Sequence, residues 1–585
     1  MSLSAQATIS YLDFTAFLDG LSGAERDHLA AQTLLFVYPV LQANRFELIE
    51  QPVGQRQLMT SCQAAGCRVD HAIAHGSAGQ EWEITRSPEA SDAPPQWVVL
   101  NPMIALWPLL GELCQALRAA FPDATLVVHT SDQHQHEKLI GGPRAPVIAQ
   151  KLLDQVATVD VVLIGFAEHS LLSLVLGQPS GLVLHRHSSA KVALRGAYFT
   201  MDSLPRPPSL ASSAAEQKRG IRVQRGRGCL APCTYCIESQ VNRVATGERS
   251  WDGAGISGFV QHINALSQAG YFFINLMDSS FEDPGRRGID DLRLFCRMLV
   301  GQRIEVSIKM HLRAETVQKL SDDDLVLLKS AGVDVLVIGI ESGSNEELAF
   351  FHKIADRETS QASFKRLEQN GQFATILGYM MFGPTTTMAM LHEKIAFLGA
   401  IGRGWDFLNL TNRVLVFWGS RMHDQLIERG LADEDDAHVG WVPYRFADPA
   451  VAVLAERFDA LKRASGVYAR LNNRMYDAIN LESRLLNPAH QSYRQRAGER
   501  FDRFQQALRA REAALSQCYV AAFTALLADP THPFVGEDEI APLVEHLDQD
   551  MQTLLAFLDP GERPETLQLQ TWMSAVNALG TGGQR

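Results

Sequence analysis

Three cysteines within one short stretch have the types and the spacing to do chemistry. Cys229, Cys233 and Cys236 follow one another as C-x3-C-x2-C. Thiolates are soft ligands suited to zinc and to iron–sulfur clusters. A structural zinc site normally has a fourth Cys or His at short spacing, but the next histidine is His262 and the next cysteine is Cys296. Three thiols without a near fourth ligand favour a four-iron cluster with one iron open to a substrate.

A first series of alternating strands and helices precedes this motif. The pattern predicts strands at residues 98–100, 124–128, 159–164 and 181–184, with helices at 109–120, 146–157 and 171–176. The strands are continuous apolar runs, as in parallel strands buried on both faces. We therefore expect an open, parallel, doubly wound sheet, on which ligands bind at the carboxyl ends of the strands.

A second alternating series begins just before the cysteines. The predicted strands are 221–224, 272–276, 305–308, 333–340, 374–381 and 407–416, with helices at 257–269, 289–299, 322–331, 360–370 and 388–401. Six such units fit a partial parallel barrel. Its active site is expected at the carboxyl ends of the strands.

The two ends of the chain are less regular. Residues 14–41 are predicted as helix, and residues 46–49 and 81–84 as short strands. Residues 87–95 and 209–218 have the composition of linkers, and the chain beyond residue 425 has helical patterning. We therefore predict four domains: an N-terminal α+β domain (1–92), a Rossmann-like domain (93–208), a partial barrel (209–424) and a mainly helical C-terminal domain (425–585).

Composition narrows the class of protein. The chain has 585 residues, 46% of them hydrophobic and 20% charged, which is ordinary for a globular protein. The net charge of −13 disfavours nucleic acid and anionic membranes as partners. No apolar run is long enough to span a bilayer, and no secretory signal is evident. Eight cysteines are too few for a disulfide scaffold, so we expect a cytoplasmic protein.

The cysteine motif, with the aromatic Tyr235 before its third cysteine, resembles the signature of the radical S-adenosylmethionine (SAM) superfamily. A small parallel domain directly before such a motif resembles the cobalamin-binding members of that superfamily, which include the class B methyltransferases. Residues 160–168 look like that family's third strand and its Gly/Glu turn, and residues 204–208 like its proline-rich exit. The resemblance implies an α/β multidomain fold: a Rossmann-like cobalamin-type sheet, a partial (β/α)6 radical SAM barrel and a helical C-terminal domain.

The resemblance also implies roles for individual residues. Asp278 ends the second barrel strand in a D-x-x-F-like segment, and Glu341 and Ser342 belong to a G-x-E-S-like segment. The residues implied to bind SAM are Tyr235, Asp278, Lys309, Arg313, Glu341, Ser342 and Tyr379. The residues implied to bind cobalamin are Asn101, Pro102, Ser131, Gly165 and Glu168. The cluster ligands would be Cys229, Cys233 and Cys236.

One departure concerns the cobalamin site. Other cobalamin proteins use a D-x-H-x-x-G motif after the first strand to supply a histidine to cobalt, but this chain has residues 101–107 there without that pattern. Residues 132–134 contain D-x-H, but they follow the second strand and lack the glycine, so they are interpreted as a loop. Cobalamin would therefore be held without that axial histidine. An alternative is a cobalamin-type fold that has lost the cofactor.

The function implied by the resemblance is radical methyl transfer. Cleavage of SAM at the reduced cluster would give a 5′-deoxyadenosyl radical, and cobalamin would carry the methyl group to an unactivated carbon or phosphorus in natural-product biosynthesis. Expected partners are a small-molecule or peptide substrate and an electron donor such as flavodoxin or ferredoxin. Three alternatives stay open: non-methylating chemistry (cyclisation, rearrangement or aminocarboxypropyl transfer), a methylthiotransferase with a second cluster on Cys62, Cys67 and Cys114, and a zinc-binding interaction scaffold. A metal site at Cys62 and Cys67 with His71 and His75 is also conceivable.

Overall fold

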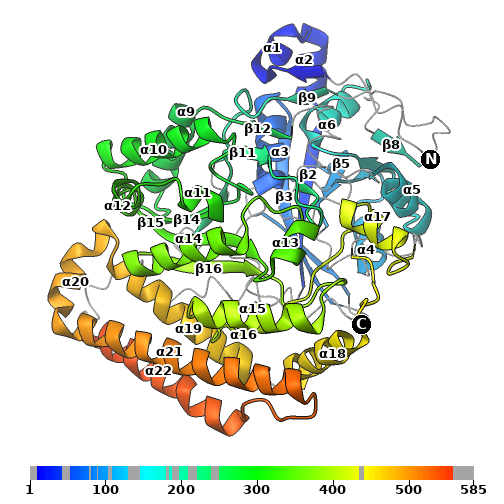
Figure 1. The fold of residues 1–585 in the computed structure, drawn as a ribbon. Coiled ribbons are helices and arrows are strands. Elements are labelled where there is room, and N and C mark those ends of the chain that lie inside the picture. Colours follow the sequence, from blue (N-terminus) through cyan, green and yellow to red (C-terminus); the bar gives the residue numbers. More distant parts are fainter. Residues whose placement is uncertain are drawn as a thin grey trace.

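The structure is a computed structural model (Figure 1). It describes residues 10–41, 53–77, 79, 81–87, 90–102, 109–129, 145–178, 183–186, 197–208, 220–238, 250–433, 441–464 and 466–557. Several predictions fall outside these residues: Ser131, the strand at 46–49, the linker at 209–218 and the D-x-H segment at 132–134.

A seven-stranded sheet dominates the N-terminal part. Its strands are β2 (Thr33–Leu41), β3 (Arg68–Gly76), β4 (Glu83–Arg86), β5 (Trp97–Leu100), β6 (Thr125–Val128), β7 (Val161–Leu163) and β8 (Val183–His185). They lie in the order β4-β3-β2-β5-β6-β7-β8. The five central strands are parallel, while β4 and β8 run antiparallel at the two edges. Strands on both sides of residue 92 thus share one sheet, so the predicted division into two domains there does not match the strand pairing.

Helices cover both faces of this sheet. Helices α3 (Val53–Ala64) and α6 (Ala167–Val175) share a core with one face, and α4 (Leu110–Ala120) and α5 (Ala145–Gln155) share a core with the other. Successive residues of a strand point to opposite faces, so β2 places Leu34 in one core and Leu35 in the other. A continuous apolar sequence is therefore required, and the predicted doubly wound sheet is observed.

Two local predictions for this part of the chain are wrong. Residues 14–41 are not one helix: α1 (Phe14–Gly20) and α2 (Gly23–Ala30) are followed by β2. Ser22 and Glu25 form a capping box that begins α2, and the apolar run from residue 33 is a strand buried on both faces. The strand predicted at 181–184 forms β8, but it is antiparallel to β7.

The second sheet is five-stranded and wholly parallel. Its strands lie in sequence order: β10 (Ile221–Val223), β13 (Phe273–Leu276), β14 (Ser307–Arg313), β15 (Val333–Glu341) and β16 (Ala374–Tyr379). The helices between and after them are α9 (Ile256–Gln268), α10 (Arg286–Gly301), α11 (Ala314–Val317), α12 (Asp322–Ser330), α13 (Asn345–Phe350), α14 (Arg357–Asn370) and α15 (Met388–Ala400). A short antiparallel pair, β11 (Gly226–Gly228) and β12 (Trp251–Gly253), carries the cysteine loop.

The predicted sixth strand, residues 407–416, is wrong for its first half. Residues Phe407–Thr411 form helix α16, because the Asp406 carboxylate accepts hydrogen bonds from the backbone N–H groups of Leu408 and Asn409 and caps its start. The chain then makes only a single parallel bridge, between Phe382 and Arg413, beside β16.

The C-terminal part is helical over its described residues. It comprises α17 (Arg421–Glu428), α18 (Pro449–Ala464), α19 (Val467–Leu485), the 3-10 turn Pro488–His490, α20 (Gln491–Ala497), α21 (Glu499–Ala528) and α22 (Glu537–Phe557). Helices α18 to α22 share one hydrophobic core with the barrel, whereas α17 places Met422 and Leu426 in the core of α4 and α5. Figure 1 shows the long α21 and α22 side by side on the outside of the barrel. Among the helices described, none has the length and apolar character needed to cross a membrane.

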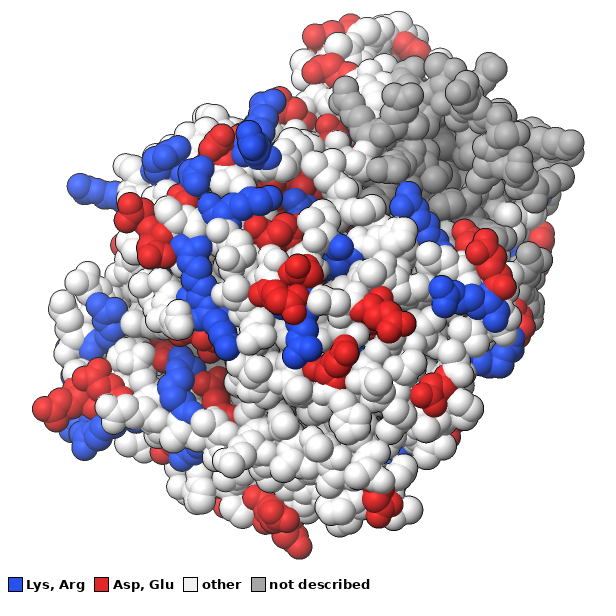
Figure 2. Space-filling view, in the orientation of Figure 1, with Lys and Arg blue, Asp and Glu red and all other residues white. Residues whose placement is uncertain are grey.

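The surface carries both signs of charge. On the face in Figure 2, acidic and basic side chains are interspersed. This mixture agrees with a chain that has 66 acidic and 53 basic side chains.

Candidate functional site

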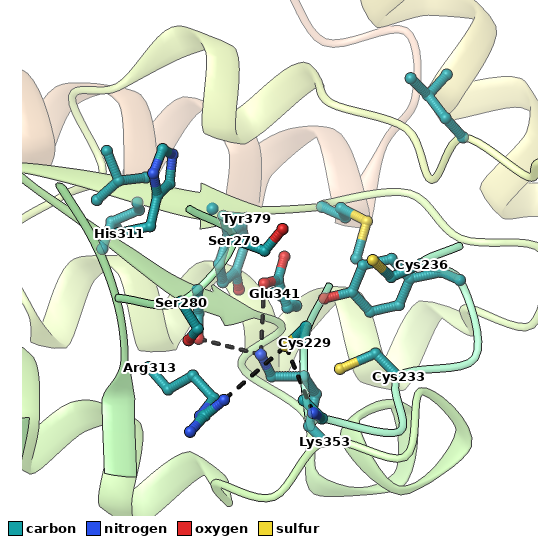
Figure 3. Close-up of a pocket in the computed structure, with 18 of the residues that line it drawn as sticks. Cys229, Cys233, Cys236, Ser279, Ser280, His311, Arg313, Glu341, Lys353 and Tyr379 are labelled. Atoms are coloured by element: carbon teal, nitrogen blue, oxygen red, sulfur yellow. Dashed lines mark hydrogen bonds and ion pairs between the residues drawn. The ribbon is translucent and has the colours of Figure 1, made fainter. Parts of the chain in front are cut away.

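Cys229, Cys233 and Cys236 line one cavity of about 460 Å³ at the carboxyl ends of the barrel strands (Figure 3). Its other lining residues are Ala231, Tyr235, Ser279, Ser280, His311, Leu312, Arg313, Val337, Gly339, Glu341, Lys353, Leu377, Gly378, Tyr379, Met380, Asn412, Arg413, Leu415, Phe417 and Trp441. The predicted cluster ligands and four of the predicted SAM residues (Tyr235, Arg313, Glu341 and Tyr379) therefore meet at one place.

Backbone hydrogen bonds fix the cysteine loop against the barrel. The Cys229 N–H donates to the Ser250 carbonyl at 2.9 Å, and the Leu230 N–H donates to the Asp283 carboxylate at 3.0 Å. Further along, the Thr234 N–H donates to the Phe351 carbonyl at 3.0 Å. The loop thus has a defined position set by its own backbone.

Asp278 belongs to this support rather than to the cavity wall. Its carboxylate accepts hydrogen bonds from the backbone N–H groups of Arg225 at 3.0 Å and Gly226 at 2.7 Å. The side chain is buried, and burial raises its pKa to about 6. The resemblance predicts that Asp278 binds SAM. The structure instead places Asp278 under the segment that leads to the cysteines, and it does not line the cavity.

The three thiols need a cation to become ligands. Burial raises the pKa of Cys229 to about 12, and it raises the pKa of Cys233 and Cys236 as well. A bound metal reverses this, because it favours the thiolate. Among the residues that the structure describes, no group of three or more His, Cys, Asp or Glu side chains is placed to hold a single metal ion. Three thiols along one cavity match the ligands of a four-iron cluster that leaves one iron open.

Strand alternation decides which residues of β14 face the cavity. Ile308 and Met310 lie in the hydrophobic core, so the alternate residues His311 and Arg313 face the inside of the barrel. Leu312, near the end of the strand, belongs to the core and also borders the cavity. Lys309 lies on the same face of β14 as His311, two residues before it, and does not line the cavity. Figure 3 shows His311 at the end of the cavity away from Cys233 and Cys236.

Glu341 is turned into the cavity by an unusual backbone conformation. Its φ of 71° is in the left-handed region, and the pairing register with β16 shifts beside it. A Cβ on Gly339 would lie 2.7 Å from one Glu341 carboxylate oxygen, and a Cβ on Gly378 would lie 3.4 Å from the other. These two neighbouring glycines leave the space that the carboxylate occupies.

Two cations lie beside the cysteines. Lys353 Nζ is 3.4 Å from the Glu341 carboxylate and 3.3 Å from the Gly339 carbonyl. Arg313 pairs with Asp283 at 2.9 Å and lies 3.9 Å from Cys229 Sγ. Arg313 also contacts Glu282 and Glu315 at 3.4 Å and 3.0 Å. Both cations are therefore held in place by carboxylates at the edge of the cavity.

The remaining predicted SAM residues divide between the cavity and its support. Tyr379 lines the cavity, but its hydroxyl donates to the Lys394 carbonyl at 3.0 Å. Ser342 is fully buried and donates to the Glu347 carboxylate at 2.6 Å, beneath the cavity wall. Lys394 forms a fully buried ion pair with Glu347. Ser342 thus supports the segment that carries Glu341.

Sequence reasoning missed Lys353 and His311. Lys353 lies 12 residues after Glu341, beyond the recognisable G-x-E-S-like segment, so no motif points to it. The β-strand alternation around Arg313 is a signal that could have found His311. Burial and the charge of Lys309 lower the pKa of His311 to about 4, so its imidazole is neutral near pH 7.

At the seven-stranded sheet, Asn101 and Pro102 are buried at the carboxyl end of β5. Gly165 follows β7 with a φ of 74°, and a Cβ there would lie 2.6 Å from the Tyr198 hydroxyl. Glu168 does not present a free carboxylate at this edge, because it forms a buried ion pair with Arg227.

The cysteines outside the motif do not converge. Cys62 and Cys67 lie in the core on one face of the seven-stranded sheet, and Cys114 lies in the core on the other face. The sheet separates them, so the three cannot hold one cluster. This arrangement disfavours a methylthiotransferase with a second cluster on these residues.

Solved structures of other proteins have a similar fold. The cobalamin-dependent SAM radical enzyme OxsB, with aqua-cobalamin and SAM bound, aligns at a TM-score of 0.61 and 15% identity over 95% of this chain and 85% of its own. The radical SAM methyltransferase TsrM from Kitasatospora setae, with cobalamin and a [4Fe-4S] cluster bound, aligns at 0.50 and 13% identity over 72% of this chain and 84% of its own. The chain has the fold of the cobalamin-dependent radical SAM enzymes. Comparisons of the sequence with protein-family models and with curated proteins find no match.

Within the cobalamin-dependent radical SAM fold, the donor set fits a cluster and SAM. Three thiols share a cavity wall with Arg313 and Lys353, and cations beside thiolates and a carboxylate-bearing ligand are electrostatically favourable. At the carboxyl edge of the seven-stranded sheet, the described residues offer cobalamin a buried amide, Asn101, and a glycine, Gly165. Both edges are where ligands bind on parallel sheets.

Proposed function

We propose that this protein is a radical SAM enzyme that uses cobalamin. The observation that carries the proposal is the meeting of Cys229, Cys233 and Cys236 with Glu341 and Lys353 in one cavity at the carboxyl ends of five parallel strands. The fold shared with OxsB over nearly the whole chain supports it.

In this proposal the thiolates of Cys229, Cys233 and Cys236 would hold a [4Fe-4S] cluster, and the residues that line the same cavity would hold SAM. When bound, the cluster and SAM supply radical chemistry and cobalamin supplies a transferable methyl group. Lys353 and Arg313 hold positive charge beside the cysteines, while Glu341 offers an acceptor inside the cavity. Leu377, Met380 and the other apolar lining residues exclude water from a reactive intermediate.

The substrate would enter at the end of the cavity that holds His311. Its imidazole is kept neutral by burial, and its Nδ1 has no hydrogen-bond partner among the described residues. A buried polar atom without a partner is destabilising, so a substrate hydroxyl or amide that donated to it would gain binding energy. We propose a small-molecule or peptide substrate and an electron donor such as flavodoxin or ferredoxin.

Methyl transfer to an unactivated carbon or phosphorus in natural-product biosynthesis is the leading reaction, supported by the likeness to the methyltransferase TsrM. Non-methylating chemistry, such as cyclisation or rearrangement, is the second candidate. It stays open because the alignment that spans 95% of this chain is with OxsB, whose description names no methyl transfer, whereas the alignment with the methyltransferase spans 72%.

Metal analysis after anaerobic purification tests the proposal. We expect about four irons and four sulfides per chain and no stoichiometric zinc, as for a [4Fe-4S] cluster. Each of the variants Cys229→Ala, Cys233→Ala and Cys236→Ala should lose the visible absorbance of the cluster and all SAM cleavage, while Cys296→Ala, which alters a buried cysteine of the barrel core, should keep both. One zinc per chain, or SAM cleavage retained in any of the three variants, would contradict it.

Cobalamin dependence separates the two reactions. Enzyme reconstituted with and without hydroxocobalamin should be assayed with isotopically labelled methyl-SAM and candidate substrates. Methyl transfer predicts a labelled product only with cobalamin. Full turnover with no label in the product would favour the non-methylating reaction.

A further inference from the structure

A buried ion pair joins the seven-stranded sheet to the cysteine loop. Glu168 and Arg227 have side chains that are only 2% and 3% exposed. Arg227 donates two hydrogen bonds to the carboxylate, from Nη2 to Oε1 and from Nη1 to Oε2, the latter at 3.3 Å. The guanidinium also lies 4.3 Å from the centre of the Phe166 ring. The Arg227 side chain is therefore held by two neighbouring residues of one turn.

Glu168 lies at the edge of the sheet proposed to bind cobalamin, and Arg227 lies next to the proposed cluster ligands. Glu168 is the second residue of α6, just after Gly165 at the carboxyl edge of β7. Arg227 is in β11, two residues before Cys229. The ion pair thus links the edge of one sheet with the strand that presents the first cysteine of the motif.

The two hydrogen bonds fix the orientation of the Arg227 guanidinium as well as its distance from the Glu168 carboxylate. A guanidinium that donates two hydrogen bonds to one carboxylate has a fixed orientation, which a single point charge would not have. Because both groups are buried, loss of one partner leaves the other as an uncompensated charge that must move toward water. Movement of Arg227 would carry β11 and Cys229 with it.

Further hydrogen bonds join the two parts at β12 and just after it. The Met201 N–H donates to the Asp252 carboxylate in β12 at 2.8 Å, and the Gly255 N–H donates to the Asp202 carboxylate at 2.8 Å. These bonds hold β12, the partner of β11. Both strands of the short pair are therefore attached to the N-terminal part of the chain, β12 through backbone–carboxylate bonds and β11 through Arg227.

We propose that Glu168 and Arg227 are positioning residues for the iron–sulfur cluster: they set the place of Cys229 from the Gly/Glu turn of the seven-stranded sheet. In this role the Glu168 carboxylate is engaged by the cluster loop and does not bind cobalamin. The inference rests on the proposed function, since it assumes a cluster on Cys229, Cys233 and Cys236.

The test uses the full-length protein, reconstituted anaerobically with iron and sulfide. The variant Glu168→Gln keeps the shape of the side chain and removes its charge. We expect it to hold less than half the iron of the wild type, or to shift the electron paramagnetic resonance g-values of the reduced cluster. Its affinity for hydroxocobalamin, measured by absorbance titration, should stay within about twofold of the wild type.

Two further variants keep the result interpretable. Arg227→Lys retains the charge pair, so it should fold and melt near the wild-type temperature. It should still shift the g-values, by less than Glu168→Gln does, because an ammonium group cannot make the two parallel hydrogen bonds of the guanidinium. Asp334→Asn removes one partner of another buried pair, Lys329 and Asp334 at 2.7 Å, at the amino end of β15. It should lower the melting temperature but leave the iron content and g-values unchanged.

The outcomes are distinct. Wild-type iron content and g-values in Glu168→Gln, or equal cluster loss in Asp334→Asn, would overturn the inference. A tenfold loss of hydroxocobalamin affinity in Glu168→Gln would also overturn it, because the carboxylate would then serve cobalamin. A wild-type protein that holds no iron after reconstitution would overturn the proposed function itself, whereas four irons and identical g-values in the wild type and in Glu168→Gln would overturn only the positioning role.

Discussion

At the scale of single residues, the cavity depends on small side chains as much as on charged ones. Glu341 reaches into the barrel because its own backbone is left-handed and because Gly339 and Gly378 leave room for its carboxylate. A non-glycine residue with positive φ is strained, and such strain persists only when the surrounding structure holds it. Here Lys353 holds the carboxylate through an ion pair at 3.4 Å.

We expect Gly339→Ala to weaken SAM binding at least tenfold. The new methyl group would lie 2.7 Å from the Glu341 carboxylate, so the carboxylate would have to shift from its place in the cavity. Equilibrium dialysis with radiolabelled SAM measures the change. Gly258→Ala is the matched control, because a Cβ at Gly258, in α9, meets nothing within 4 Å. Equal SAM affinity in Gly339→Ala and Gly258→Ala would contradict the predicted crowding.

At the scale of elements, the loop that carries the cysteines is fixed by side chains from strand ends. Asp278 follows β13 and accepts the backbone hydrogen bonds of Arg225 and Gly226. Asp283 accepts that of Leu230 and also pairs with Arg313. Aspartate side chains from the segment after β13 thus attach β11 and the loop after it to the barrel.

Replacement of Asp278 should destabilise the protein and impair its cluster. Asp278→Ala removes the acceptor of two buried N–H groups, which we expect to lower the free energy of unfolding by about 2–4 kcal/mol. Iron content should fall with it, since the segment before Cys229 loses its anchor. Urea unfolding followed by circular dichroism measures the first effect, and colorimetric iron analysis the second. If Asp278→Ala unfolded and bound iron like the wild type, the carboxylate would have no such structural role.

At the scale of the whole molecule, the N-terminal sheet and the barrel are joined by buried polar contacts as well as by apolar packing. His262 in α9 hydrogen-bonds the Pro207 carbonyl at 2.9 Å, near the end of the segment that connects the two parts. Arg56 in α3 donates to the Pro208 carbonyl at 3.2 Å. Burial lowers the pKa of His262 to about 4, so the histidine is neutral in the folded protein near pH 7.

This histidine predicts a loss of stability in mild acid. The folded pKa of about 4 is below the unfolded value of about 6.5, so the unfolded chain binds the proton first as the pH falls. The contribution is complete above about pH 6.5 and is lost as the pH falls toward 4. Between about pH 7.5 and pH 5, we expect His262 to lower the free energy of unfolding by about 2 kcal/mol.

The measurement compares the wild type with His262→Gln, whose amide can still donate to the Pro207 carbonyl but does not titrate. The difference in the free energy of unfolding between the two proteins, from urea unfolding, should move in favour of the variant by that amount at about pH 5. A difference independent of pH would show that His262 titrates normally in the folded state.

The sequence alone determined the chemistry of the cysteines and most of the elements that surround them. The C-x3-C-x2-C spacing, the continuous apolar strands and the helix caps are local signals, because they depend on residue type and short-range spacing. They predicted the parallel sheets and the strand ends that carry Glu341 and Arg313. They failed at residues 407–411, where a cap at Asp406 outweighs an apolar pattern, and at residues 33–41, where burial on both faces makes a strand.

Only the tertiary structure decided which side chains meet. Lys353 reaches Glu341 from a loop, Asp278 turns toward the backbone of the cysteine loop, and Glu168 pairs with Arg227 across two sheets. These contacts join residues that are far apart in the chain. A position at the end of a strand determines at which edge of the sheet a side chain lies, but it does not determine which side chain it contacts. That contact depends on how other elements pack against the same edge, which local sequence patterns do not predict.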